Sequence, residues 1–193
     1  KPKPLITIGN RPIIWHIMKL YYHYKINDFI ICCGYKGELI KSYFNDYLLN
    51  NSDFTIDFKS QKKIFHNKNF ENWKITLVDT GLETMTGGRL KRVQNFLKNE
   101  KNFLLTYGDG LANVNIKKLI DFHVSHKKIA TLTGIELKSR FGVLSVAKNN
   151  RAVSFLEKPK YNKSLVNGGY FVFSNKFFKY LNNDSTVLEK KPL

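Results

Sequence analysis

The sequence predicts an α/β fold in which a Rossmann-like sheet, mixed but mostly parallel, is flanked by helices. Apolar runs of strand length alternate with segments of helical period through the first quarter of the chain. Further on, the apolar run at 103–106 is followed, after Tyr107, by the glycine-bounded carboxylate of Asp109. The chain has 193 residues, of which 42% are hydrophobic, enough for the core of a single domain over 1–193.

The first elements alternate strand, helix, strand, helix. Residues 5–8 are a short apolar segment, and Pro12 opens a helix whose apolar side chains recur at helical spacing: Ile13, Ile17, Leu20, Tyr21 and Tyr24. Residues 29–33 are a continuous apolar run of strand length, and residues 36–49 return to the helical period. This alternation is typical of a doubly wound sheet.

The pattern then changes to short β-like segments. Residues 54–66 interleave apolar and charged side chains, and residues 73–79 alternate before the turn at Thr80 and Gly81. We therefore expect an excursion of antiparallel strands from about 54 to 79, rather than another crossover.

The second half returns to alternating helices and strands. A helix opens at Gly87 and Gly88 and precedes the strand at 103–106, and another helix covers 116–124. Further strands are expected at 130–137, 142–146, 153–156 and 170–173.

The chain is strongly basic, with 32 Lys+Arg against 15 Asp+Glu and a net charge of +17. The lysines are spread through every segment rather than gathered on one. We interpret the excess as a solvated surface that also suits small anionic substrates, and we expect no nucleic-acid partner. Nucleic-acid binding is the less favoured alternative.

The cysteines and the hydropathy predict a cytoplasmic protein without a membrane partner. Cys32 and Cys33 are adjacent in an apolar strand, so their side chains point to opposite faces and cannot easily form a disulfide. No apolar run approaches the roughly 18 residues of a membrane span. No charged-then-apolar leader opens the chain.

The segment FLLTYGDG at 103–110 carries the strongest candidate for chemistry. In an open α/β sheet, ligands bind at the carboxyl ends of the strands, which is where Asp109 lies. A carboxylate there, between glycines that let phosphates approach the backbone, suits Mg²⁺ carrying a nucleotide. The alternative is an ordinary turn that uses Asp because Asp tolerates turn geometry.

Two further polar segments suit phosphate. The prolines of KPKP hold the backbone extended, so Lys1 and Lys3 can grip phosphate groups, unless they form a frayed charged terminus. The segment at 84–89, TMTGGR, feeds a helix amino terminus whose backbone N–H groups could bind an anion or a base edge. Simple helix capping explains TMTGGR equally well.

A last group of polar residues follows the late strands. Glu157 can accept hydrogen bonds from sugar hydroxyls, and Lys158 can neutralise a phosphate, although an ordinary surface ion pair is equally compatible. The segment at 167–169, NGG, precedes an apolar strand. We assign all five histidines to the core or the surface, because none has metal-site spacing with cysteines or carboxylates.

Short blocks of the sequence occur in an order that is similar to one known family: KPKP, HIMKLYY, FIICCGYKG, LVDTG, TGGRLKR, TYGDG, FGVLSV, FLEKPK and NGGYFV. Over essentially the whole chain they resemble the sugar-nucleotide pyrophosphorylases, nucleotidyltransferases with the nucleotide-diphospho-sugar transferase fold. The WHIM, CCGYKG and TGGRLKR blocks resemble the family's cytidylyltransferases. The resemblance implies transfer of a cytidylyl group from CTP to α-D-glucose 1-phosphate, with Mg²⁺ as cofactor.

The resemblance also implies roles for individual residues. Lys3 and Asp109 match the catalytic pair, a phosphate-contacting lysine and a Mg²⁺ carboxylate. The positions that match the nucleotide site are Lys3, Thr86, Gly87, Gly88, Gly108 and Asp109. Those that match the sugar-phosphate site are Gly142, Glu157, Lys158, Asn167 and Gly168.

The sequence departs from the family at both ends. The family has a glycine-rich, arginine-bearing loop before KPKP and a second metal-binding aspartate beyond the last block, and neither lies within these residues. The resemblance therefore implies a domain truncated at both termini, with little or no activity from these residues alone. It also implies a homo-oligomer, and we expect the β excursion at 54–66 to be a contact surface. A sibling uridylyl- or thymidylyltransferase and a non-catalytic basic binding protein remain the alternatives.

Overall fold

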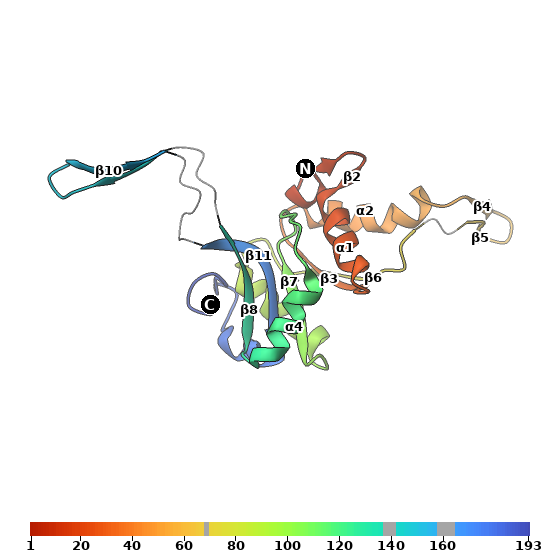
Figure 1. The fold of residues 1–193 in the computed structure, drawn as a ribbon. Helices are drawn as coiled ribbons and strands as arrows, with labels where there is room; N and C mark the ends of the chain where they lie inside the picture. The colour runs from red at the N-terminus through yellow and green to blue at the C-terminus, as the bar shows by residue number, and fades with distance from the viewer. Residues whose placement is uncertain (68–69, 137–141, 158–164) are drawn as a thin grey trace.

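The computed structural model describes residues 1–67, 70–136, 142–157 and 165–193 (Figure 1). The first segment contains a single 3₁₀ turn and two short antiparallel strands: η1 (Lys3–Leu5), β1 (Thr7–Ile8) and β2 (Arg11–Pro12). Helix α1 (Ile13–His23) begins directly after Pro12, as expected. The side chains of α1 that are buried are those at helical spacing, namely Ile14, Ile17, Met18 and Tyr21.

Strand β3 (Asp28–Cys33) and helix α2 (Gly37–Asn50) follow as predicted. Strand β3 pairs with β6 (Lys74–Asp79) in parallel, from Asp28 opposite Lys74 to Cys33 opposite Asp79. The prediction that residues 74–79 belong to an antiparallel excursion is therefore wrong. The four inner residues of β6 are all half-buried, because the strand returns beside β3 after the α2 crossover instead of exposing one face.

The antiparallel part of that region is a hairpin of β4 (Phe54–Asp57) and β5 (Lys62–Phe65). Figure 1 shows it extending from the end of α2, away from the remaining elements. The side chain of Phe58 at its tip is 86% exposed.

The second half is built around β11 (Leu165–Ser174), the central strand of a three-stranded antiparallel sheet of order β7-β11-β8. Its neighbours are β7 (Asn102–Thr106) and β8 (Ala130–Glu136). Residues 170–173 of β11 are at most 2% exposed. Their phenylalanine rings pack with Phe103 and Phe177 to form the core. The helices of this half are α3 (Thr86–Arg92) and α4 (Ile116–His126), and short 3₁₀ helices cover Gln94–Leu97 and Asn175–Tyr180.

Strands β9 (Val143–Val146) and β10 (Ala152–Leu156) form a separate antiparallel hairpin. All of their residues are exposed, and Figure 1 shows this hairpin standing away from β8 and β11.

A cavity of about 600 Å³ lies between the β3–β6 pair and the β7-β11-β8 sheet. Its lining includes apolar residues of β3, such as Ile30, and of β7, such as Leu104, and it also reaches Thr86 and Gly108. In the described part of the chain, no helix combines the length and the hydropathy that crossing a membrane requires.

Candidate functional site

The end of β7 and the KPKP segment meet in space. The ammonium Nζ of Lys3 lies 3.6 Å from Oδ2 of Asp109. Leu5, which closes the η1 turn, is 6% exposed and anchors the segment in the core. A Cβ on Gly108 would lie 3.2 Å from Pro4, so the glycine leaves room for the proline to approach. The structure therefore brings together the two predicted catalytic residues, and the frayed-terminus alternative is disfavoured.

Both members of this pair are open to a ligand. The side chain of Lys3 is 78% exposed and that of Asp109 is 42% exposed. An ion pair this exposed contributes little to folding stability. A Cβ on Gly110 would meet no atom within 4 Å, which leaves open space beside the carboxylate.

The residues at this position fit Mg²⁺. The ion is commonly held by one or two carboxylates, with phosphates and water completing its octahedral shell. Asp109 supplies one such carboxylate at an exposed strand end. Over the described residues there is no cluster of three or more His, Cys, Asp or Glu side chains that could form an all-protein metal cage.

The amino end of α3 differs from the expectation. The backbone N–H groups of Gly87 and Gly88 donate to the carbonyl oxygen of Thr186, at 2.9 and 3.1 Å, and both glycines are buried. The sequence suggested that these N–H groups face an open anion or base site, but in the structure they do not. The capping alternative describes Gly87 and Gly88 better, with a later segment of the chain as the cap.

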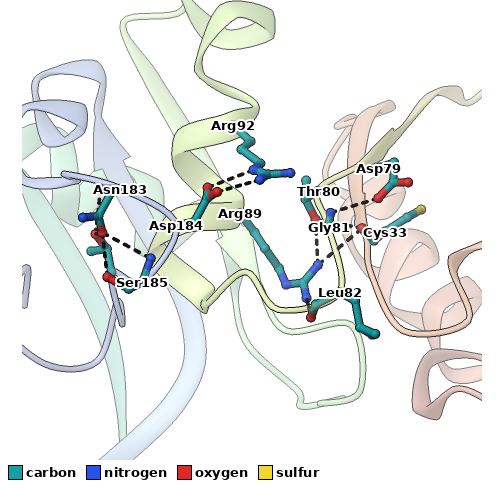
Figure 2. Close-up of polar contacts among 11 residues, drawn as sticks. Cys33, Asp79, Thr80, Gly81, Leu82, Arg89, Arg92, Asn183, Asp184 and Ser185 are labelled. Carbon is teal, nitrogen blue, oxygen red and sulfur yellow. Dashed lines mark hydrogen bonds and ion pairs between the residues drawn. The ribbon is translucent and has the colours of Figure 1, made fainter.

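That capping segment, residues 183–189, is called here the C-terminal strap. Figure 2 shows how α3 holds the first residues of the strap. The Nε and Nη2 atoms of Arg92 donate to the two carboxylate oxygens of Asp184, at 2.9 and 2.6 Å. The carbonyl of Asp184 accepts from the N–H of Met85 at 2.8 Å. A Cβ on Gly88 would lie 2.5 Å from the carbonyl oxygen of Asp184. Glycine is required at position 88 because the strap crosses α3 at this distance.

We predict that Gly88→Ala destabilises the protein by about 1–3 kcal/mol, because the new methyl group forces the backbone of Asp184 to move. The matched control is Gly110→Ala, whose methyl group enters open space and should change stability by less than about 0.5 kcal/mol. Urea unfolding followed by circular dichroism compares the two variants. Equal stabilities would contradict the close crossing.

Arg89 fixes α3 against the carboxyl ends of β3 and β6, a role that no motif in the sequence predicted. Its guanidinium donates to the carbonyls of Cys33 and Leu82 at 3.3 and 3.1 Å, and to Oγ1 of Thr80 at 2.7 Å (Figure 2).

Burial raises the pKa of the neighbouring Cys32 thiol to about 11, so at neutral pH this thiol is protonated and is a poor nucleophile.

A hydrogen-bond network next to the Lys3–Asp109 pair joins residues from the two predicted subsites. The amide Nδ2 of Asn167, on β11, donates to the hydroxyl of Tyr107 at 3.1 Å. The hydroxyls of Tyr107 and Thr86 each donate to one carboxylate oxygen of Glu189, at 2.5 and 2.7 Å. Asn167 and Thr86 were predicted for the sugar and the nucleotide, whereas Tyr107 and Glu189 were missed.

The environment sets the protonation states in this network. Burial, followed by the hydrogen bond to Glu189, raises the pKa of Tyr107 to about 12. Burial alone would raise the pKa of Glu189, but the hydrogen bonds from Tyr107 and Thr86 outweigh it and the pKa is lowered. At neutral pH a neutral phenol therefore donates to an ionised carboxylate.

The other predicted sugar residues are divided between two places. Gly168 packs on β8, where a Cβ would lie 2.9 Å from Ile135. Gly142 and Glu157 lie together at the base of the β9–β10 hairpin, where a Cβ on Gly142 would be 3.0 Å from Oε2 of Glu157. The hairpin lies apart from the end of β7 (Figure 1). Lys158 lies outside the described residues.

Comparisons with known proteins agree on one family. A family model described as nucleotidyl transferase matches residues 1–192. The glucose-1-phosphate cytidylyltransferase of Salmonella typhimurium is 49% identical over 193 residues, which are 100% of this chain and 75% of that protein. The probable glucose-1-phosphate cytidylyltransferase of Bacillus subtilis is 46% identical over 193 residues, which are 100% of this chain and 74% of that protein.

The fold has relatives among solved structures. HddC from Yersinia pseudotuberculosis matches with a TM-score of 0.68 at 20% identity, covering 98% of this chain and 75% of that one. The structure of HddC complexed with GMP-PN matches with the same TM-score. At this level of identity the likeness shows the fold alone, and it confirms the predicted α/β class.

Proposed function

The chain belongs to the nucleotidyl transferase family, and we propose that its protein transfers a cytidylyl group from CTP to α-D-glucose 1-phosphate, giving CDP-glucose and pyrophosphate. The observation that carries the proposal is the meeting of Lys3 and Asp109 at the exposed end of β7. Identity of 49% and 46% to two cytidylyltransferases supports the choice of CTP and glucose 1-phosphate.

In this reaction an oxygen of the sugar phosphate attacks the α-phosphorus of CTP in line. A new P–O bond forms while the bond to the oxygen of the β-phosphate breaks, and pyrophosphate leaves with the electron pair. Because little covalent chemistry falls to the protein, catalysis is positioning and charge neutralisation. In the proposal, Lys3 neutralises phosphate oxygens. Asp109 holds Mg²⁺, which when bound offsets the charge on the phosphates.

The nucleotide end of the site is proposed to lie between β7 and α3. Gly108 lets phosphates approach the backbone, and Thr86 faces the ribose and the base. Gly87 and Gly88 act at this end indirectly, because their missing side chains and their N–H groups hold the C-terminal strap against α3. This assignment keeps the predicted residues but changes how the two glycines act.

The sugar end is proposed to use Asn167 and Gly168 on β11 for hydroxyls of the hexose. The match to the family's sugar-phosphate site, rather than the position of the β9–β10 hairpin, supports further hydroxyl contacts by Gly142 and Glu157 and binding of the sugar phosphate by Lys158.

We predict that Lys158→Ala mainly raises the KM for glucose 1-phosphate. Loss of a charge-assisted contact worth about 1.5–3 kcal/mol corresponds to roughly a 10- to 150-fold change. The matched control is Lys148→Ala, an exposed lysine in the turn of the β9–β10 hairpin, which should leave that KM unchanged. Initial rates at varied glucose 1-phosphate measure both variants, and an unaltered KM in Lys158→Ala removes Lys158 from the site.

The experiment for the function is a panel of nucleotides with the complete gene product. Pyrophosphate release is followed with CTP, UTP, dTTP or GTP, together with glucose 1-phosphate and Mg²⁺, and the sugar nucleotide is identified by mass. The proposal expects CDP-glucose from CTP and little turnover of the other nucleotides. Preference for UTP or dTTP would identify a sibling transferase. Salt-sensitive nucleic-acid binding without turnover, indifferent to CTP, would identify a non-catalytic basic protein.

We also propose a homo-oligomer in which the β4–β5 hairpin is a contact surface. Its side chains Ile56, Phe58 and Ile64 are 44%, 86% and 55% exposed, which is unusual for a hairpin without a partner. Sedimentation velocity tests this, because a single species at the monomer mass would contradict it.

A further inference from the structure

We propose that Glu189 is a positioning residue that ties the nucleotide end of the site to the sugar end by holding Tyr107 and Thr86. The inference rests on the proposed cytidylyl transfer and adds to it a residue from the C-terminal strap. It makes the strap part of the catalytic architecture, beyond its contact with α3.

The first observation is the bridging geometry of the carboxylate. Its Oε1 accepts from the hydroxyl of Tyr107 and its Oε2 accepts from the hydroxyl of Thr86, so each oxygen holds a different element. Tyr107 follows β7 directly, whereas Thr86 opens α3. Removing the carboxylate would leave both hydroxyls without their acceptor.

Tyr107 is fixed from its other sides as well. A Cβ on Gly169 would lie 2.9 Å from the Tyr107 ring, so only glycine allows the ring to lie here, and Gly169 also has a φ of +76°. The ring of Phe171 packs edge-on against Tyr107 at 5.7 Å between centroids. Asn167 donates to the same phenol that Glu189 accepts from. The hydroxyl of Tyr107 therefore links Glu189 of the strap to Asn167 of β11.

Tyr107 also lies two residues before Asp109 in the chain. The orientation of the 107–109 segment sets where the carboxylate of Asp109 and the ammonium of Lys3 meet. A change in the hydrogen bond to Glu189 is thus expected to move the catalytic pair relative to the hexose contact at Asn167.

The strap holds Glu189 in place. Leu188 is completely buried, and its N–H donates to Oγ1 of Thr86 at 2.9 Å. The Thr86 hydroxyl thus accepts from one strap residue and donates to the next. The strap is also fixed five residues before Glu189, by the ion pair between Asp184 and Arg92. Because these contacts already order the backbone of the strap, holding the Glu189 carboxylate in one direction costs little additional conformational entropy.

The pKa directions give the pH range over which the bridge is complete. The pKa of Glu189 is lowered in the folded protein, so the ionised carboxylate stabilises the fold. This contribution to the free energy of unfolding is present above the pKa of Glu189 in the unfolded chain, and it is lost as the pH falls through the pKa of Glu189 in the folded protein. The bridge is therefore intact at neutral pH.

The test is a double-mutant cycle in the complete gene product with Tyr107→Phe, Glu189→Gln and the double variant. Rates are normalised to the sites titrated by CTP, so that misfolded protein does not enter kcat. We expect a loss of about tenfold in kcat for each single variant, within the 100-fold that a displacement of 1 Å can cause. The KM values for CTP and glucose 1-phosphate should change less than kcat. The double variant should be no slower than the worse single variant, because both changes break one unit.

The controls are Tyr180→Phe and Glu38→Gln, which make the same chemical changes at exposed side chains outside the cavity lining, and both should keep wild-type kcat. Unchanged kcat in Glu189→Gln, or additive losses in the double variant, would overturn the inference while leaving the proposed function intact. Absence of CDP-glucose formation by the wild-type protein would overturn the proposed function, and the inference with it.

Discussion

Asp109→Asn is expected to abolish Mg²⁺-dependent turnover, lowering kcat by about 10³-fold, the upper range for removing one electrostatic contact in an active site. The amide has nearly the shape of the carboxylate but no charge, and it is a poor ligand for a hard cation. The fold should survive, because Asp109 is 42% exposed and its ion pair with Lys3 is weak. Pyrophosphate release across a Mg²⁺ titration measures the effect, and circular dichroism checks the fold.

Asp121→Asn is the matched control. Asp121 is also an exposed aspartate paired with a lysine, at 2.7 Å from Lys117 on α4. It lies outside the proposed site, so the same chemical change should leave kcat within about twofold of wild type, as expected for a surface substitution. Wild-type turnover by Asp109→Asn at saturating Mg²⁺ would exclude Asp109 as a metal ligand.

Lys3→Met is expected to lower kcat/KM for CTP by about 100-fold, because the ammonium that offsets the triphosphate charge is lost while most of the side-chain length is kept. Little stability should be lost, since the Lys3 side chain is 78% exposed. Lys117→Met is the matched control, because it also breaks a lysine–aspartate pair. Initial rates at varied CTP measure both variants.

The double variant Lys3→Met/Asp109→Asn separates catalysis from simple charge balance. If Lys3 served only to neutralise Asp109, removing both charges would restore activity relative to either single variant. The proposed phosphate and metal roles instead predict that the double variant is at least as slow as Asp109→Asn. Recovery of turnover in the double variant would contradict these roles.

The sequence predicted those elements whose hydrophobic period is unambiguous. Helix α1 begins at the position that Pro12 marks, and the apolar run of β7 ends before the Gly108–Gly110 turn, because local backbone chemistry determines both boundaries. The partner of β6 was not predictable in the same way. A strand covered on both faces and an exposed hairpin strand can show the same short alternation, so pairing direction depended on contacts distant in the sequence.

The candidate site divides along the same line. The chemistry of Lys3 and Asp109 was visible in KPKP and YGDG, but their distance of 3.6 Å depends on the folding of η1 against Gly108. The fit of the strap over Gly87 and Gly88 was not visible, because no local pattern relates a helix start to residues almost 100 positions later. Glu189 was missed for that reason, as a single acid near a lysine-rich end carries no motif.

The central claim is that Asp109 holds the metal of a bound nucleotide at the end of β7. Amide NMR with CTP and substoichiometric Mn²⁺, which takes the same oxygen ligands as Mg²⁺, measures this directly through paramagnetic broadening. We predict that the amide signals of Gly108 and Gly110 broaden while those of the β4–β5 hairpin do not, and that Asp109→Asn removes the effect. Broadening centred on another part of the molecule, or broadening that persists in Asp109→Asn, would contradict the claim.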